Sequence, residues 1–452
     1  MKKFALAALV AVFLFGSVNT ASAMDDKAVW AQGFINVYFQ WLNNSDFEKK
    51  DAEDDFIAAQ RTRMYVDYMS GENLTGVVRF EIDNNWGDGA SGGGAGADGI
   101  RVEVKNSFIK WTVPDTDLVM TMGIQGVALP SATYGQPVLN NDVAAVVASN
   151  KFSDMFTATL FWARLGDTRG NGETLFSSAT KSDVTSNPGN ADEYDAVGLI
   201  LPIAFDGGTI TPWGVWTTQG KDAAGTTKKS TGQWIGGALK VTAFDPISLG
   251  LDVMHGKVST TPDTSDANGW FAAADVTYKM DMLTASLVGF TSSGNDSSTT
   301  DGTEVMPVIS NGNGAFAPTT FGTYGDWNMG SSNILTEGPG AQGIGIKLTN
   351  LSSMENLTHE INVFYFKGTS KKDAAASLSG GWSNTAVFTK DDSAWEVNFE
   401  SVYSIYENLS AVLDLSMVDA NFSKTAGART TATSTGASET AYKGAFQIQY
   451  NF

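Results

Sequence analysis

The stretch Tyr442-Lys443-Gly444-Ala445-Phe446-Gln447-Ile448-Gln449-Tyr450-Asn451-Phe452 alternates between apolar and polar residues with the period of a β-strand. Apart from Gly444, its even positions carry aromatic or large aliphatic side chains, whereas its odd positions are mostly polar. Such a strand is typical of a transmembrane β-barrel, whose outer face contacts lipid and whose aromatic side chains lie at the headgroup level. A frayed, polar end is more usual in a soluble domain. The stretch therefore predicts the wall of a membrane barrel.

The beginning of the sequence indicates export. Basic residues Lys2 and Lys3 precede an apolar run from Phe4 to Phe15, and Ala21-Ser22-Ala23 is a small-residue cleavage site. We expect residues 1–23 to be a cleaved signal peptide and residues 24–452 to form a single transmembrane β-barrel domain in the outer membrane of a Gram-negative cell. No later apolar run reaches the roughly 18 to 20 residues that a membrane-spanning helix needs.

Composition excludes several functional classes. Charged residues make up only 17% of the chain, below the roughly 25% of an ordinary soluble domain. The chain has no Cys, which removes disulfides, thiolate catalysis and Cys-based metal sites. A formal net charge of −20 argues against nucleic acid as a partner.

Strand-like segments of about 10 residues recur along the whole chain. Long loops and short turns alternate between them, as the extracellular loops and periplasmic turns of outer-membrane barrels do. We predict an all-β fold, a transmembrane antiparallel β-barrel of 18 strands. Pro202 and Pro212 disturb the alternation in two of these segments, which leaves 16 strands as an alternative. The predicted strands are 29–42, 55–69, 74–84, 100–113, 118–126, 142–152, 156–165, 194–204, 209–219, 232–244, 248–258, 269–279, 283–292, 341–350, 357–368, 393–405, 409–422 and 440–452.

One long connection differs from the others. Residues 127–141 are rich in Pro and apolar side chains and carry no charge before Asp142. A loop of this character is poorly suited to water and fits a position folded inside the barrel. We predict that it narrows a pore, with Tyr134, Gln136, Asn140 and Asp142 lining the constriction. A subunit contact or an ordinary packed surface loop is the alternative.

Strand parity predicts further side chains that line the lumen. Both signs of charge occur among them, and a pore wall with both signs tunes ion selectivity. The alternative is that these groups pair across neighbouring strands and only neutralise one another. Net charge does not decide the selectivity, because much of the acid lies in loops. The basic candidates are Arg61, Arg63, Arg79, Arg101 and Lys105, and the acidic candidates are Glu81, Asp83, Glu103, Glu396, Glu400 and Asp414.

Catalytic and metal-binding patterns are weak. The two histidines, His255 and His359, share strand faces with apolar neighbours, which favours wall packing over general base chemistry. Asp83, Asn85 and Asp88 do not match the spacing of a 12-residue calcium loop. We expect no enzyme activity, no catalytic residue, no metal and no cofactor.

Three stretches carry a resemblance to a known family: Asp55-Phe56-Ile57-Ala58-Ala59-Gln60-Arg61-Thr62-Arg63, Glu72-Asn73-Leu74-Thr75-Gly76-Val77, and Met122-Gly123-Ile124-Gln125-Gly126-Val127-Ala128-Leu129-Pro130-Ser131. They resemble the homotrimeric porins of sulphate-reducing bacteria, and the similarity extends over the mature chain. The resemblance implies a homotrimer of water-filled pores for passive diffusion of ions and small hydrophilic solutes, surrounded by outer-membrane lipid and lipopolysaccharide.

The same resemblance makes Tyr450 and Phe452 an expected assembly signal for the outer-membrane barrel assembly machinery. Three other functions stay open from the sequence. They are a substrate-selective, sugar-type porin, a structural outer-membrane barrel with a blocked lumen, and a secreted soluble β-protein.

Overall fold

The structure is a computed structural model. It describes residues 27–45, 47, 55–96, 102–167, 193–220, 229–261, 266–298, 302–310, 316–323, 339–371, 388–422 and 439–452. The predicted signal peptide (residues 1–23) and Arg101 lie outside the described residues. No helix among those described is long and apolar enough to cross a membrane.

Among the described residues, nineteen β-segments form one antiparallel sheet, and each segment except β8 pairs with the next along the chain. Segments β8 and β9 both pair with β7 and with β10, so together they make one strand, interrupted at Leu201 and Pro202. Proline has no N–H to donate to the ladder. The carbonyl of Pro202 still accepts from Thr157 N, at 3.1 Å. The predicted barrel of 18 strands is therefore confirmed, and the alternative of 16 is wrong.

The segments are β1 (Lys27–Asn43), β2 (Asp55–Ser70), β3 (Leu74–Asn85), β4 (Glu103–Thr112), β5 (Leu118–Ala128), β6 (Asn140–Ser153), β7 (Phe156–Asp167), β8 (Glu193–Ile200), β9 (Ile203–Phe205), β10 (Gly208–Gln219), β11 (Lys229–Phe244), β12 (Ile247–Thr261), β13 (Ala267–Lys279), β14 (Thr284–Ser292), β15 (Ala341–Met354), β16 (Leu357–Gly368), β17 (Ser393–Tyr406), β18 (Leu409–Asn421) and β19 (Ala441–Asn451).

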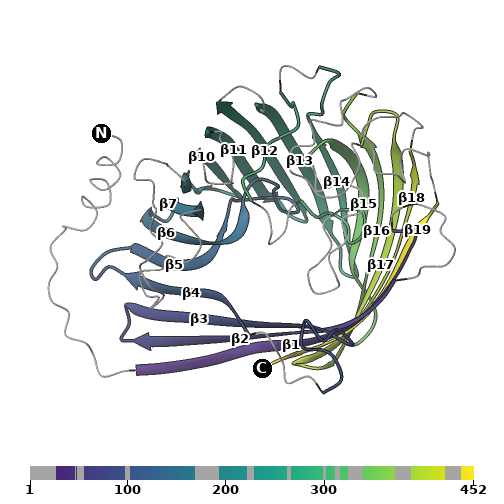
Figure 1. The fold of residues 1–452 in the computed structure, drawn as a ribbon, viewed down its shortest axis with the longest axis horizontal. Helices are drawn as coiled ribbons and strands as arrows, with labels where there is room; N and C mark the ends of the chain where they lie inside the picture. Colours follow the sequence, from purple (N-terminus) through teal and green to yellow (C-terminus); the bar gives the residue numbers. More distant parts are fainter. Residues whose placement is uncertain are drawn as a thin grey trace, which may run out of the picture.

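The last strand closes the barrel against the first. β19 pairs with β1 from Phe34↔Asn451 to Asn43↔Tyr442, and in Figure 1 the yellow end of the chain lies beside the purple β1. Closure leaves neither strand with an unpaired edge, which a barrel needs inside a bilayer.

The alternation of the last strand has the predicted orientation. Lys443, Ala445 and Gln447 are buried on the inner face, whereas Tyr442 and Phe446 remain exposed on the outer face. The irregular parity near Ser107 comes from a β-bulge, because the register between β3 and β4 shifts between Arg79 and Phe80.

The apolar core lies on the inner side of the wall, between the strands and loop segments that fold into the barrel. Wall residues such as Trp234, Phe271 and Phe364 are almost completely buried against loop residues such as Leu139 and Phe316. The lumen is thus partly filled by its own loops.

Candidate functional site: the barrel interior

The connection between β5 and β6 crosses the interior and reaches β12. The carboxylate of Asp252, which is fully buried on β12, accepts hydrogen bonds from Ser131 Oγ at 2.7 Å, Ala132 N at 2.8 Å and Thr133 N at 3.0 Å. Thr133 Oγ1 also donates to it. A carboxylate that accepts several hydrogen bonds is a strong anchor, because each bond is charge-assisted. The tip of this loop is therefore fixed to the inner wall.

The same loop extends to β15, on the far side of the barrel from β5. The ammonium of Lys347 on β15 lies 4.8 Å from the ring centroid of Tyr134. The Tyr134 carbonyl accepts from Ala317 N at 2.9 Å, which joins this loop to another segment inside the barrel, residues 316–323. Burial raises the pKa of the Tyr134 phenol above its ordinary value.

The base of the loop is packed tightly. Gln136 is 3% exposed, and its side chain accepts from Val138 N at 2.7 Å and donates to the Leu139 carbonyl at 2.5 Å. Asn140 N donates to the Ser310 carbonyl at 2.8 Å. These contacts make Gln136 a brace within the loop, and the narrowing of a pore by residues 127–141 stays a prediction.

Two glycines on the inner wall allow this close packing. A Cβ at Gly250 on β12 would lie 2.5 Å from the Ala132 carbonyl oxygen. A Cβ at Gly269 on β13 would lie 2.4 Å from Met306 N. Both positions therefore exclude any side chain while the loops keep their places.

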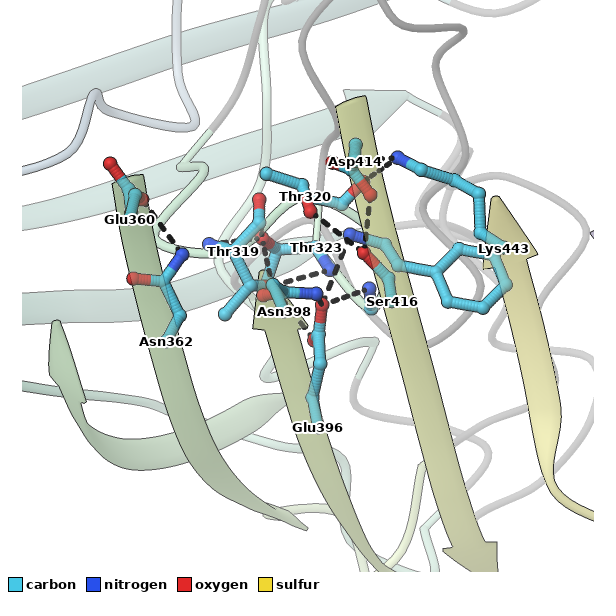
Figure 2. A network of polar contacts seen from close by, with 12 residues as sticks. Thr319, Thr320, Thr323, Glu360, Asn362, Glu396, Asn398, Asp414, Ser416 and Lys443 are labelled. Carbon is cyan, nitrogen blue, oxygen red and sulfur yellow. Dashed lines mark hydrogen bonds and ion pairs between the residues drawn. The ribbon is translucent and has the colours of Figure 1, made fainter. Parts of the chain in front are cut away.

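A second inward segment, residues 316–323, is held by Glu396 on β17 (Figure 2). The Glu396 carboxylate is fully buried and accepts from Phe321 N and Gly322 N, both at 3.0 Å, and from Thr319 Oγ1 at 2.8 Å. Asn398 Nδ2 also donates to it, at 2.8 Å. Glu396 is thus an anchor for the loop and has no exposed surface in the lumen.

Asp414 on β18 is covered in the same way. It is fully buried, accepts from Ser416 Oγ at 2.7 Å and lies 3.6 Å from the ammonium of Lys443 on β19. Lys443 in turn donates to the Thr320 carbonyl at 2.7 Å. The expectation that Glu396 and Asp414 line an open pore is corrected here, because the segment 316–323 covers both of them. Their inward direction agrees with the parity of their strands.

Glu400 on β17 lies between two other acids at one level of the wall. It pairs directly with Glu360 on β16 and with Asp414 on β18. The Glu360 carboxylate is 3.0 Å from Lys347 Nζ and accepts from Asn362 Nδ2 at 2.8 Å. Glu360 and Glu400 are partly exposed, so they keep contact with the remaining lumen.

The opposite charges on β2 and β3 form cross-strand pairs. Arg61 pairs with Asp83, and Arg63 pairs with Glu81, at directly opposed positions of the two strands. Arg61 Nε also lies 3.7 Å from Glu81. The alternative reading of these residues, a ladder of mutually neutralising charges, describes the geometry of these four side chains well.

Arg79 on β3 differs from the other two arginines. Its guanidinium lies 4.9 Å from the ring centroid of Tyr65 and 5.9 Å from that of Phe108, and Asn106 Oδ1 is 3.5 Å away. Among the described residues no carboxylate lies within ion-pair distance of it. Arg79 therefore contributes an uncompensated positive charge to this wall, stabilised by aromatic faces.

The remaining candidates lie around the bulge at the start of β4. Lys105 Nζ is 2.6 Å from Asp142 Oδ2, and Asn106 Nδ2 donates to Asp142 Oδ1 at 2.9 Å. Glu103 is exposed and is directly opposite Glu81 in the ladder. Lys105 and Asp142 are thus brought together as a pair.

The terminal aromatic residues face away from this interior. Tyr450 is exposed, and its ring lies 6.0 Å from that of Phe452. The Phe452 backbone exchanges two hydrogen bonds with Gly33 on β1, at 2.8 and 3.0 Å. The assembly role of these two residues stays a prediction.

Sequence reasoning missed Asp252 and Lys347, which hold the crossing loop. The signal for both was present, because each lies on the inward parity of a predicted strand. Thr319 and Phe321 were missed for another reason: segment 316–323 has no periodicity that shows which way its residues point.

Comparison with known proteins gives a match in structure and none in sequence. No protein-family model matches the chain, and no curated protein matches it by sequence. Solved structures with the same fold over nearly the whole chain include the following three. A BenF-like porin from Pseudomonas fluorescens Pf-5 is 13% identical, with 95% of this chain and 100% of that chain covered and a TM-score of 0.54.

The other two structures are from Pseudomonas aeruginosa. OpdQ is 10% identical, with 96% of this chain and 99% of that one covered and a TM-score of 0.55. OccK5 (OpdH) is 11% identical, with coverages of 96% and 99% and a TM-score of 0.53. At these identities the likeness establishes the porin-type barrel fold.

Proposed function

We propose that this protein is an outer-membrane porin, a channel for passive diffusion of ions and small hydrophilic solutes. The observation that carries the proposal is the two-sided wall of the closed barrel. Its outer face exposes apolar side chains such as Ile235, Leu287 and Ile344. Its inner face carries Arg61 and Arg63 with the acids paired with them, and the separate charge of Arg79. A water-filled lumen within a lipid-facing wall is the arrangement that porins use.

The crossing loop supports a selective passage. Residues 129–139 divide the interior between β5 and β12, so a solute would pass beside them along the wall of β1 to β4. Arg79 and Glu81 on β3 are partly exposed on this wall. Glu360 on β16 is partly exposed on the adjoining wall. Both signs of charge at such a passage would orient polar solutes.

The location and partners belong to the same proposal. Export through the signal peptide would bring the barrel to the outer membrane, where the assembly machinery would insert it among lipid and lipopolysaccharide. A homotrimer, the state of the porins of sulphate-reducing bacteria that the sequence resembles, is the expected assembly. We propose that the protein performs transport and no chemical step.

Reconstitution into a planar bilayer tests the function. Purified protein should give stepwise ohmic conductance, and insertion of trimers should give steps in groups of three. Liposomes that contain the protein should also swell in solutions of small sugars and amino acids. Protein that inserts into the bilayer and stays closed in both assays would contradict the proposal and favour a structural barrel with a blocked lumen. Extraction by buffer without detergent would instead indicate a secreted soluble β-protein.

A further inference from the structure

A cavity of about 450 Å³ lies at the rim of the barrel from which the long loops emerge. Its volume is in the range of small-ligand sites. The segments around it are the ends of β14 and β16, the starts of β13 and β15, and the loop that precedes β17. The lining side chains that matter here are those of Trp270, Ser293, Gln342, Lys367, Thr369 and Lys390.

The cavity opens on the outer face of the wall. On β16, Phe364 and Phe366 are fully buried inside, so the alternating Tyr365 and Lys367 point outward. Gln342 on β15 is exposed and directly opposite Lys367. On β13, Trp270 is 44% exposed, next to the fully buried Phe271. A ligand in this cavity would therefore approach from the membrane side and not from the lumen.

Aromatic residues on the outer face indicate where the cavity lies along the membrane normal. Tyr365 and Trp395 are directly opposite on β16 and β17, and their ring centroids are 4.9 Å apart on the outer face. Aromatic belts mark the headgroup level of a bilayer. Lys367 lies two residues beyond Tyr365 toward the long loops, which is about 7 Å along a strand. The Lys367 ammonium is thus positioned where lipid phosphates lie.

The charge of the cavity is positive. Neither Lys367 nor Lys390 has an ion-pair partner among the described residues, whereas the adjacent Lys371 lies 3.4 Å from Asp296 Oδ2. Ammonium groups are effective point-charge ligands for phosphate. The Gln342 amide is an additional hydrogen-bonding group on the same lining, whereas the Ser293 hydroxyl accepts from Trp270 N at 2.8 Å and donates to the Trp270 carbonyl at 3.3 Å.

We propose that this cavity binds the phosphate of a phosphorylated glycolipid headgroup in the outer leaflet. Lys367 and Lys390 hold the phosphate, Trp270 packs against the sugar, and the acyl chains descend over Tyr365 and Trp395. The proposal rests on the proposed function, because it requires the barrel to lie in an outer membrane whose outer leaflet contains such lipids.

Native mass spectrometry of the detergent-solubilised protein tests it, with diphosphorylated lipid A and dephosphorylated lipid A as the two probes. The wild type should bind the phosphorylated form at least about tenfold more tightly, since each lysine near a membrane surface contributes appreciably to binding anionic lipid. The double variant Lys367→Gln/Lys390→Gln should lose this preference. Lys257→Gln is the matched control, because Lys257 is exposed on the outward face of β12 at the same rim.

Three results would overturn the inference. They are unchanged lipid preference in the double variant, an equal loss in Lys257→Gln, and displacement of the lipid by inorganic phosphate at equal concentration. The last would indicate a site for free phosphate. Conductance separates this inference from the proposed function, since the double variant should conduct like the wild type. A barrel that binds the lipid and never conducts contradicts only the proposed function, and one that conducts without lipid preference contradicts only this inference.

Discussion

Asp252 Oδ2 accepts a hydrogen bond from Ser131 Oγ at 2.7 Å, and this contact joins residues 121 positions apart in the sequence. Asp252→Ala should release the loop tip, because it removes the carboxylate that accepts from Ser131 Oγ, Ala132 N and Thr133 N. Hydrogen bonds to charged groups contribute about 1.5–3 kcal/mol each. The free energy that holds the loop against β12 should therefore fall by at least the contribution of one such bond. Single-channel recording should show larger and noisier conductance. Asp252→Asn, which keeps one acceptor oxygen, should have a smaller effect. Equal current noise in the wild type and Asp252→Ala would contradict the role of Asp252 as the anchor of the loop tip.

Gly269→Ala should displace the segment 302–310 from the inner wall. The new Cβ would lie 2.5 Å from the Glu304 carbonyl oxygen and 2.4 Å from Met306 N, so the backbone must move. Overpacking of this kind typically costs about 1–3 kcal/mol. The midpoint of thermal unfolding in detergent should fall. Gly237→Ala is the matched control, since the nearest atoms there are 3.8 Å away.

Arg79→Gln should shift the channel toward cations. Arg79 has aromatic partners and no carboxylate within ion-pair distance among the described residues, so its charge is not cancelled locally. One unit charge about 8 Å from a permeating ion in water contributes roughly 0.5 kcal/mol, which corresponds to about a twofold change in permeability ratio. The reversal potential in a salt gradient measures it.

Charge reversal within the Arg63 and Glu81 pair provides the control for Arg79. The double variant Arg63→Glu/Glu81→Arg keeps the net charge of that pair, so its reversal potential should stay close to that of the wild type. An unchanged reversal potential in Arg79→Gln would remove Arg79 from the account of selectivity.

Glu396→Ala should detach the segment 316–323. The substitution leaves Phe321 N and Gly322 N without their acceptor in a buried place. Each unsatisfied buried donor costs about 1–3 kcal/mol. Limited proteolysis should then cut within 316–323 faster than in the wild type. Glu400→Ala, at a partly exposed position on the same strand, should leave the cleavage rate unchanged, and equal acceleration in both variants would argue against a specific anchor.

Strand parity predicted the wall well and the interior less well. The directions of Arg61, Arg63 and Glu81 follow from period-two alternation, which is a local property of the chain. Whether an inward carboxylate such as Glu396 faces water or a loop depends on a segment more than 70 positions away, since Phe321 N and Glu396 are separated by 75. That distant segment has no periodicity from which its position could be predicted. Pro202 disturbed the alternation as expected, yet flanking hydrogen bonds preserve the strand that it interrupts.

The pairing of β1 with β19, which we call the seam of the barrel, determines the order in which the strands assemble. Asn44 Nδ2 donates to the Thr440 carbonyl at 3.2 Å across 396 positions, so residues near the two ends of the described chain must meet before the wall is continuous. Hairpins can form while the polypeptide is still being delivered, but the seam cannot, because its two strands lie at opposite ends of the described chain. Until the seam forms, β1 is an open edge that could pair with another chain. The interval between delivery of β1 and delivery of β19 is therefore when this protein most needs a chaperone.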